Sequence, residues 1–208
     1  MNKNWKEFLK NLKNLYTHPG HDITHIKRVY KNALMIAKSV KCDIDIVKAA
    51  ALLHDVSRGE EWDGKIKDHA SEGAKRAKKI LEKTNFPKEK ISAVCYAIKV
   101  HRFRKGIKAR TIEAKILQDA DRLDALGAII VTRMLRHNLR RPIYDPKIKP
   151  REKYIGPSTT VYNHFIEKIS KITPESFHTK TAQKIAEHRY EFVVSFFKEL
   201  VEEFEGRR

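Results

Sequence analysis

The sequence predicts an all-α protein, a helical bundle that carries a proline-rich loop and a C-terminal helical extension. Two observations lead to this prediction. Apolar side chains recur with the roughly 3.6-residue period of an amphipathic helix along nearly the whole chain. Neither a convincing pair of strands nor an internal repeat is found among the 208 residues. A chain of this length can bury a sizeable core, so we expect the helices to pack around one.

The helices expected before the proline-rich loop span residues 5–16, 22–40, 43–57, 69–85, 86–103 and 111–139. Asp22 and Asp43 stand where the second and third of these begin, and aspartate is a preferred N-cap residue. Pro87 stands near the first turn of the fifth helix, where proline is well tolerated. The last of these segments is so long that a break in its middle is open.

The chain changes character over residues 140–160. Four of the seven prolines lie here, together with apolar residues such as Ile143 and Tyr154. This composition indicates a long ordered loop, and such loops in compact domains are often functional. Two further helices follow, over residues 159–172 and 179–206. We expect one structural domain with a helical core at 1–140, the loop at 141–160 and C-terminal helices at 161–208 packed on that core.

The chain is strongly basic, with a formal net charge of +18. Such a charge attracts phosphorylated small molecules and nucleic acids alike. The lysines are dispersed and no known nucleic-acid motif appears, so nucleic-acid binding is possible but not favoured. No apolar run reaches the roughly 18 residues of a membrane span. The first residues do not form a secretion signal, and the two cysteines make no disulfide framework. We therefore expect a cytoplasmic protein with no membrane partner.

A chemical problem arises where His54 and Asp55 follow an apolar run that is expected to be buried. A buried carboxylate is costly unless it is paired, hydrogen-bonded or bound to a metal. The partners must come from other helices, and the candidates are His25 and an aspartate of the segment QDADRLDAL. Asp119 and Asp121 lie about 200° apart around a regular helix, so the two cannot easily ligate one ion.

One histidine, the His54–Asp55 pair and one further carboxylate form a mixed nitrogen and oxygen donor set. Such a set suits a divalent ion, with Mn as the first choice and Fe, Ni, Co, Mg or Zn as alternatives, and it leaves positions for water and substrate. The cation would neutralise Asp55, and water bound to a metal becomes a nucleophile at neutral pH.

The order of these residues resembles the H…HD…D order of the HD superfamily of metal-dependent phosphohydrolases. The segments HDITHIKRV, AALLHDVSR, HRF, QDADRLDALGAI, STTVYNHFIEKI and AEHRYEF extend the likeness over roughly residues 20 to 205. They resemble the bacterial and archaeal subfamily of predicted HD hydrolases that includes a nucleotide pyrophosphohydrolase. The resemblance implies an HD-domain helical bundle whose metal ligands are His25, His54, Asp55 and Asp121, with Asp121 selected over Asp119. It also implies that His54 and Asp55 are catalytic, and that Asp55 orients the attacking water.

Other residues are assigned supporting roles. Arg28 is the preferred phosphate clamp because it shares a helix face with His25. The further candidates for substrate contact are His101, Arg133 and Lys168, and those for partners of the ligands are Asp124 and His21. His69 is expected to begin the fourth helix. In binuclear HD enzymes extra histidines bind a second metal, and His69 and His101 occupy similar places. The adjacent histidine pair of those enzymes is absent, so one ion or two are both open.

The resemblance implies hydrolysis of a nucleotide, most naturally of a nucleoside or deoxynucleoside triphosphate to monophosphate and pyrophosphate. The same ligands would serve a nucleoside monophosphatase or a phosphodiesterase. An alternative of another class is a basic nucleic-acid-binding protein with a regulatory HD site. The expected partner is a phosphorylated small molecule, and the protein is expected to be a monomer or a homodimer.

Overall fold

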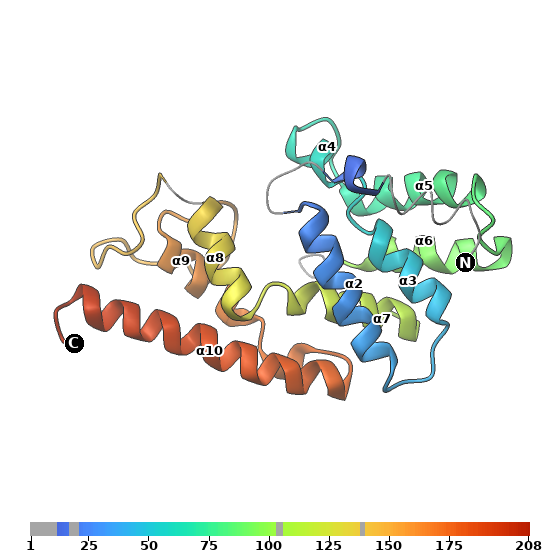
Figure 1. Ribbon diagram of the computed structural model, residues 1–208. Coiled ribbons are helices and arrows are strands. Elements are labelled where there is room, and N and C mark those ends of the chain that lie inside the picture. The colour runs from blue at the N-terminus through green and yellow to red at the C-terminus, as the bar shows by residue number, and fades with distance from the viewer. Residues whose placement is uncertain (1–11, 17–20, 103–105, 138–139) are drawn as a thin grey trace. The chain divides into compact units, whose positions relative to one another are not determined.

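The computed structural model describes residues 12–16, 21–102, 106–137 and 140–208 (Figure 1). Over these ranges it is helical with no strand, which confirms the predicted fold class. The α-helices are α2 (Ile23–Ala37), α3 (Ile44–Leu53), α4 (Arg58–Trp62), α5 (His69–Glu82), α6 (Ile91–Val100), α7 (Ile112–Leu123), α8 (Gly127–His137), α9 (Val161–Glu167) and α10 (Lys180–Phe204). Short 3-10 turns occupy η1 (Leu12–Leu15), η2 (Lys88–Lys90), η4 (Ile169–Lys171) and η5 (Pro174–Ser176). The helix expected over residues 5–16 falls largely outside the described residues.

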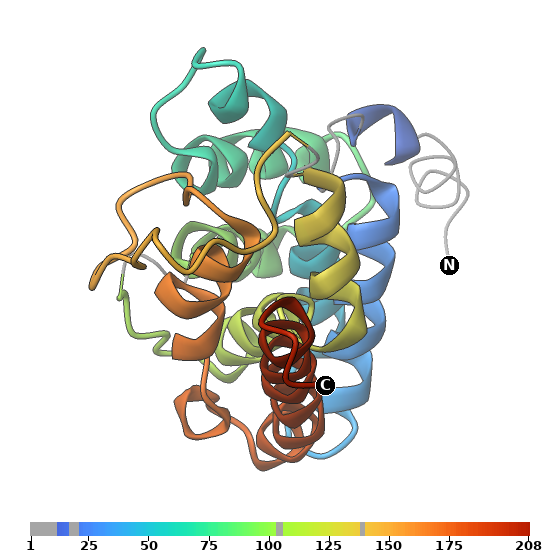
Figure 2. The ribbon, with the colours of Figure 1, turned by 90° about the vertical axis from the view of Figure 1, so that its left-hand side faces the viewer.

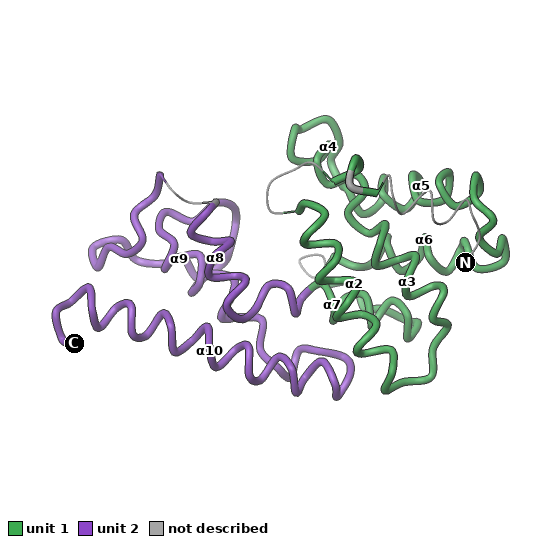
Figure 3. The backbone as a smooth tube through the Cα atoms, in the orientation of Figure 1, with its two compact units in different colours: residues 1–121 green, residues 122–208 purple. Residues whose placement is uncertain are grey.

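The chain forms two compact units, residues 1–121 and residues 122–208, and their boundary falls inside α7 (Figure 3). In the first unit α3 packs against both α2 and α6, and α5 lies along α6 (Figures 1 and 2). Its core consists of apolar side chains that repeat at helical spacing, among them Ile26, Val29, Ile36, Leu53, Ile98 and Ile116. The division of the chain at residues 140 and 160 stays a prediction.

Side-chain caps fix where two of these helices begin. Asp22 accepts hydrogen bonds from the backbone N–H groups of Thr24 and His25, and Asp43 caps α3 in the same way. Both caps agree with the sequence prediction. Because the Asp22 cap sets the first turn of α2, it also fixes the point at which the His25 side chain leaves the helix.

The sequence predicts one continuous helix over residues 43–57, and the structure shows that this prediction is wrong. The helix α3 ends at Leu53, and His54 and Asp55 lie in the turn that follows. The cause is local, because His54 Nδ1 lies 3.0 Å from the carbonyl oxygen of Ala51 and donates to it. In a continuing helix that carbonyl would accept from the backbone N–H of Asp55. The turn is closed instead by Val56 N–H to Leu53 O at 3.2 Å.

The segment 111–139 contains the break that its length left open, between α7 and α8. Gly127 begins α8 with a positive φ of 75°, a conformation that glycine adopts without strain. A Cβ atom there would lie 3.2 Å from Cγ of Arg189. The same arginine donates from Nη1 to the carbonyl of Leu123 at 2.7 Å. It thereby provides a hydrogen-bond partner for a backbone carbonyl at the C-terminal end of α7.

In the second unit α10 packs against α8. The ring of Phe197 on α10 also stacks on the ring of Phe165 on α9, with centroids 4.4 Å apart. The proline-rich loop is anchored in this unit through Arg151, whose Nη2 donates to Glu167 Oε2 at 2.6 Å. Ser158 Oγ donates to the same oxygen at 2.7 Å. Over the described ranges, every helix is too short or too polar to cross a membrane.

Candidate metal centre

In the first unit, donor atoms come together from α2, from the turn after α3 and from α7. His25 Nε2 from α2 lies 3.3 Å from His54 Nε2 and 3.5 Å from Asp121 Oδ1, which comes from α7. His54 Nε2 lies 3.9 Å from the same Asp121 oxygen. The two imidazoles are buried, whereas the Asp121 side chain is 28% exposed and faces the solvent on one side. The three donor atoms surround a space where one cation could contact all of them.

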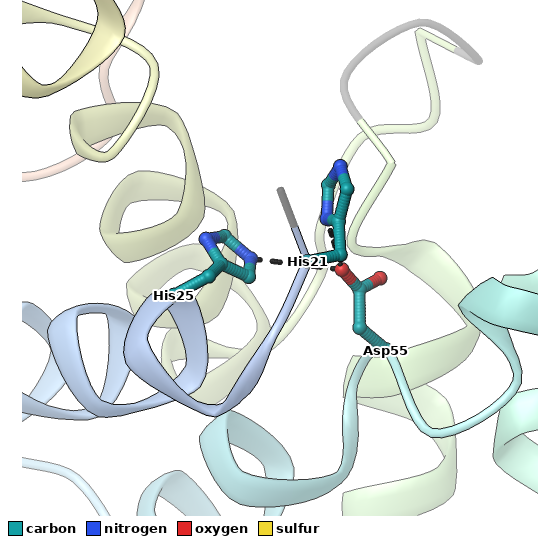
Figure 4. Close-up of side chains that lie close together, drawn as sticks. All are labelled: His21, His25 and Asp55. Carbon is teal, nitrogen blue, oxygen red and sulfur yellow. Dashed lines mark hydrogen bonds and ion pairs between the residues drawn. The ribbon is translucent and has the colours of Figure 1, made fainter. Parts of the chain in front are cut away.

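Asp55 lies beside this trio and is buried, with 3% of its side chain exposed. Its Oδ2 lies 3.6 Å from His25 Nε2 and 3.7 Å from His54 Nε2. His21 Nδ1 approaches the same oxygen at 2.7 Å, close enough for a hydrogen bond (Figure 4). The ring of His21 also meets that of His25 edge-on, with centroids 4.9 Å apart. His21 thus directly contacts Asp55 and keeps about a quarter of its own side chain exposed.

The other oxygen of Asp55 faces a second group of donors. Its Oδ1 lies 3.2 Å from His69 Nε2 and 3.6 Å from His101 Nε2, and the two Nε2 atoms are 3.4 Å apart. Both histidines are buried. His69 is the first residue of α5, as expected from the sequence, and it belongs to this donor group as well. Asp55 therefore stands between two clusters of donors, one at each carboxylate oxygen.

Two of these imidazoles are oriented by the same device. His54 follows the last residue of α3 and His101 follows the last residue of α6. Each places Nδ1 against the carbonyl three residues earlier, at 3.0 Å from Ala51 O and 2.6 Å from Ile98 O. A carbonyl only accepts, so Nδ1 carries a proton in both rings, and Nε2 is the nitrogen that can bind a cation when the ring is neutral. The helix ends thus aim two Nε2 atoms at the centre.

The electrostatics agree with a site for cations. Burial lowers the pKa of His54 to about 4 and outweighs the opposing charge of Asp55, so this imidazole is neutral at pH 7. Burial likewise lowers the pKa of His21 to about 4. Burial alone would raise the pKa of Asp55, but His54, His21 and His101 outweigh it and hold that pKa well below its usual range. His101 differs: burial opposes its charge, yet the contact with Asp55 raises its pKa.

The residues present fit a divalent ion. Three groups each bring their donor atoms within 4.8 Å of one another: His25, His54 and Asp121; Asp55, His69 and His101; and His21, His25 and Asp55. Neutral imidazoles and ionised carboxylates are donors that Mn, Fe, Co, Ni and Zn accept. Asp119 belongs to none of these groups among the described residues, although it is fully buried.

The remaining residues that the sequence singled out lie in varied settings. Arg28 is half-buried on α2 and donates from Nη1 to Thr24 Oγ1 at 3.1 Å. Three others belong to the second unit. Arg133 donates from Nη1 to the Asp124 carboxylate at 3.0 Å, and the Lys168 ammonium lies 5.3 Å from the centre of the Tyr154 ring. Substrate contact by Arg28, Arg133 or Lys168, and support of the ligands by Asp124, stay predictions.

Sequence reasoning missed a charged network behind His69. Glu61 Oε2 lies 2.7 Å from His69 Nδ1, and Arg58 and Arg102 both donate to the Glu61 carboxylate. Arg102 also donates to Asp68, which caps α5 immediately before His69. Glu61 sits on α4, a helix of 5 residues that is too short to leave a periodic signal. The sequence offers one clue to this network: Arg102 directly follows His101, and Arg58 closely follows His54.

Comparison with known proteins places this geometry in context. The model of the HD domain matches residues 22–126, about half of the chain. The Bacillus subtilis protein YpgQ is 31% identical over 191 residues, which cover 90% of this chain and 86% of YpgQ. The crystal structure of YpgQ in complex with ADP matches with a TM-score of 0.70 at 28% identity, covering 97% of this chain and 95% of that one.

Two further relatives bear on the chemistry. A predicted HD superfamily hydrolase from an uncultured Thermotogales bacterium is 33% identical, with a TM-score of 0.67 over 96% of this chain and 92% of that one. Ribonuclease Y of Treponema denticola is 35% identical over 103 residues, which make up 50% of this chain and 18% of that protein.

Proposed function

The chain belongs to the HD superfamily of metal-dependent phosphohydrolases, and from this premise we propose that it hydrolyses a nucleoside or deoxynucleoside triphosphate to the monophosphate and pyrophosphate. The observation that carries the proposal is the convergence of His25, His54 and Asp121 beside the buried carboxylate of Asp55.

In this proposal His25, His54, Asp55 and Asp121 hold a divalent ion, with Mn as the first choice. When bound, the ion supplies positive charge for a phosphate oxygen and makes water acidic enough to attack at neutral pH. The chain contributes fixed donors, because the carbonyl of Ala51 holds the His54 ring in place. Asp55, held by His21 at 2.7 Å, accepts a hydrogen bond from the attacking water and orients it toward phosphorus.

The reaction balances as a hydrolysis. Water adds to the α-phosphorus, the bond from that phosphorus to the bridging oxygen breaks, and pyrophosphate leaves. The proton lost by water passes to a carboxylate of the centre, Asp55 or Asp121, and from there to solvent. Asp121 is partly exposed and so gives the proton a route to solvent. Binding a nucleotide is supported by the YpgQ structure, which contains ADP.

A second candidate is cleavage of a phosphodiester bond in RNA. It is favoured by the match to ribonuclease Y over 103 residues, which is a match to a small part of that protein. The net charge of +18 suits a polyanionic substrate as well as a nucleotide. A mononucleotide and an RNA differ in products and in salt dependence, so they can be separated directly.

The test is product analysis with the Mn-loaded protein. Nucleoside tri-, di- and monophosphates and a single-stranded RNA are supplied, and pyrophosphate, orthophosphate and RNA fragments are measured separately. Pyrophosphate from a triphosphate is the expected result. Orthophosphate from a monophosphate would replace the proposed reaction with a nucleotidase reaction at the same site. RNA fragments alone, with a rate that falls steeply with salt, would establish the second candidate.

A further inference from the structure

The carboxylate of Glu61 and the guanidinium of Arg58 both face the same nitrogen of His69. Glu61 Oε2 lies 2.7 Å from His69 Nδ1, and Arg58 Nη1 lies 2.9 Å from it. Arg58 Nη1 and Glu61 Oε2 are themselves 2.5 Å apart. The three atoms form a closed triangle behind the imidazole, on the side of the ring away from Asp55.

These two neighbours require opposite tautomers of His69. A carboxylate only accepts, so a bond to Glu61 needs the proton on Nδ1. A guanidinium only donates, so a bond from Arg58 needs the lone pair on Nδ1, which moves the proton to Nε2. The consequence appears at the far side of the ring. With the proton on Nδ1, the Nε2 lone pair faces Asp55 and His101 and can bind a cation. With the proton on Nε2, His69 donates to Asp55 Oδ1 at 3.2 Å and cannot.

We infer that Glu61 is the positioning residue that makes His69 a metal ligand, by holding the Nδ1–H tautomer against the competing guanidinium of Arg58. The shorter contact and the negative charge of the carboxylate favour Glu61, and its oxygen can accept from His69 and Arg58 at once. Arg58 then becomes a partner of Glu61 instead of a donor to the ring.

A second arginine keeps Glu61 in this position. Arg102 donates to Glu61 Oε1 at 2.7 Å and to Asp68 Oδ1 at 2.9 Å. Asp68 directly precedes His69, and Arg102 directly follows His101. The chain neighbours of His69 and His101 therefore both belong to the network around Glu61. Outer partners of this kind commonly change metal affinity by about 10- to 100-fold.

The inference rests on the proposed function, because it concerns the donor group of Asp55, His69 and His101. Its first test uses the metal-free protein and needs no turnover. The tautomer of each histidine is read from long-range proton–nitrogen NMR correlations in protein labelled with ¹⁵N-histidine. Wild type is expected to carry the proton of His69 on Nδ1. Glu61→Ala is expected to carry it on Nε2, because Asp55 Oδ1 accepts there at 3.2 Å. Arg58→Ala is expected to keep it on Nδ1, because Glu61 remains.

Glu60→Ala is the matched control, because Glu60 lies on the same short helix and pairs with Arg76 at 3.2 Å. It is expected to leave the His69 tautomer unchanged. A Glu61→Ala protein that keeps the Nδ1 proton would overturn the inference. An Arg58→Ala protein that moves the proton to Nε2 would overturn the competing role of Arg58.

The second test measures Mn²⁺ bound per chain by equilibrium dialysis. Glu61→Ala is expected to weaken binding at the Asp55, His69 and His101 group by about 10- to 100-fold and to leave the His25, His54 and Asp121 group occupied. Unchanged affinity at both groups would overturn the inference. A wild-type protein that binds no Mn²⁺ would instead contradict the proposed function, and the tautomer of metal-free Glu61→Ala would still decide the role of Glu61.

Discussion

At the residue scale, Asp55 is the centre of the site because its two oxygens face different partners. Oδ2 faces His21, His25 and His54, and Oδ1 faces His69 and His101. An isolated buried carboxylate would be strongly destabilising. Five surrounding imidazoles offset that cost only partly, since two of them have a pKa near 4 and carry no charge at pH 7. A cation bound by these donors would supply the missing positive charge.

The histidines give the metal-free protein a predictable pH dependence. The pKa of His54 is about 4 in the folded state and 6.5 when unperturbed, so between these values the unfolded chain binds the extra proton. Stability must therefore fall as pH decreases from 6.5 toward 4. His21 and His164 act in the same direction, because the pKa of each is also about 4. The pKa of His101 is raised, so its contribution has the opposite sign and is lost as pH rises.

His54→Gln is expected to reduce this slope, because it removes one titrating group and keeps an amide that can donate to Ala51. The reduction is about 1.4 kcal/mol per pH unit, the value for one proton. The measurement is denaturant unfolding of metal-free wild type and variant at several pH values from 7 to 4. Identical slopes would show that His54 does not stay neutral in the folded protein.

At the element scale, the helix ends determine the site more than the helix bodies do. The helices α3 and α6 end one residue before His54 and His101, and each histidine bonds back to its own helix. The apolar period predicted where helices lie, because it reports which face is buried. It could not predict that α3 stops at Leu53, because that end depends on a side-chain bond from His54 that competes with the helix.

The proline-rich loop depends on one buried carboxylate. Glu167 has 1% of its side chain exposed and accepts from Arg151 and Ser158. Arg151→Ala leaves that charge without its main partner and is expected to lower the free energy of unfolding, because the Glu167 carboxylate stays buried. Arg151→Lys should recover only part of the loss, since lysine lacks the planar fork that bonds Glu167 at two nitrogens.

Denaturant unfolding of these two variants beside wild type measures the effect of the loop anchor. Arg140→Ala is a suitable control, because Arg140 is an exposed arginine directly before the same loop. Equal stability of Arg151→Ala and Arg140→Ala would contradict the anchoring role assigned to Arg151.

At the scale of the whole molecule, ion binding should appear as stability. A ligand that binds the folded state alone adds about 2.7 kcal/mol at 100 times its Kd. For a chain of this size that corresponds to a rise in Tm of roughly 5–10 °C. We expect this rise when Mn²⁺ is added to the metal-stripped protein, and its loss in His25→Ala. A thermal shift of the same size in His25→Ala would place the stabilising ion elsewhere.

Helical periodicity predicted the fold class, and the resemblance to the HD superfamily pointed to His25, His54 and Asp121, whose donor atoms lie close together in the structure. The separation of Asp119 from Asp121 around α7 was also predictable, and Asp121 is the one that meets His25 and His54. The network of Glu61, Arg58 and Arg102 was not, because it joins segments about 40 residues apart through side chains with no common motif. Such contacts depend on the tertiary packing that brings α4, α5 and α6 together.

The most direct test of the account is metal-dependent turnover in four proteins: wild type, His54→Ala, Asp121→Ala and Asp119→Asn. Each is stripped of metal, reloaded with Mn²⁺ and given a nucleoside triphosphate, and bound metal and released pyrophosphate are both measured. We expect wild type and Asp119→Asn to bind the ion and release pyrophosphate. In His54→Ala and Asp121→Ala, the rate of pyrophosphate release should fall by more than the roughly 100-fold that follows removal of an outer partner of a metal ligand. Full turnover in Asp121→Ala, or loss confined to Asp119→Asn, would contradict the assigned metal centre.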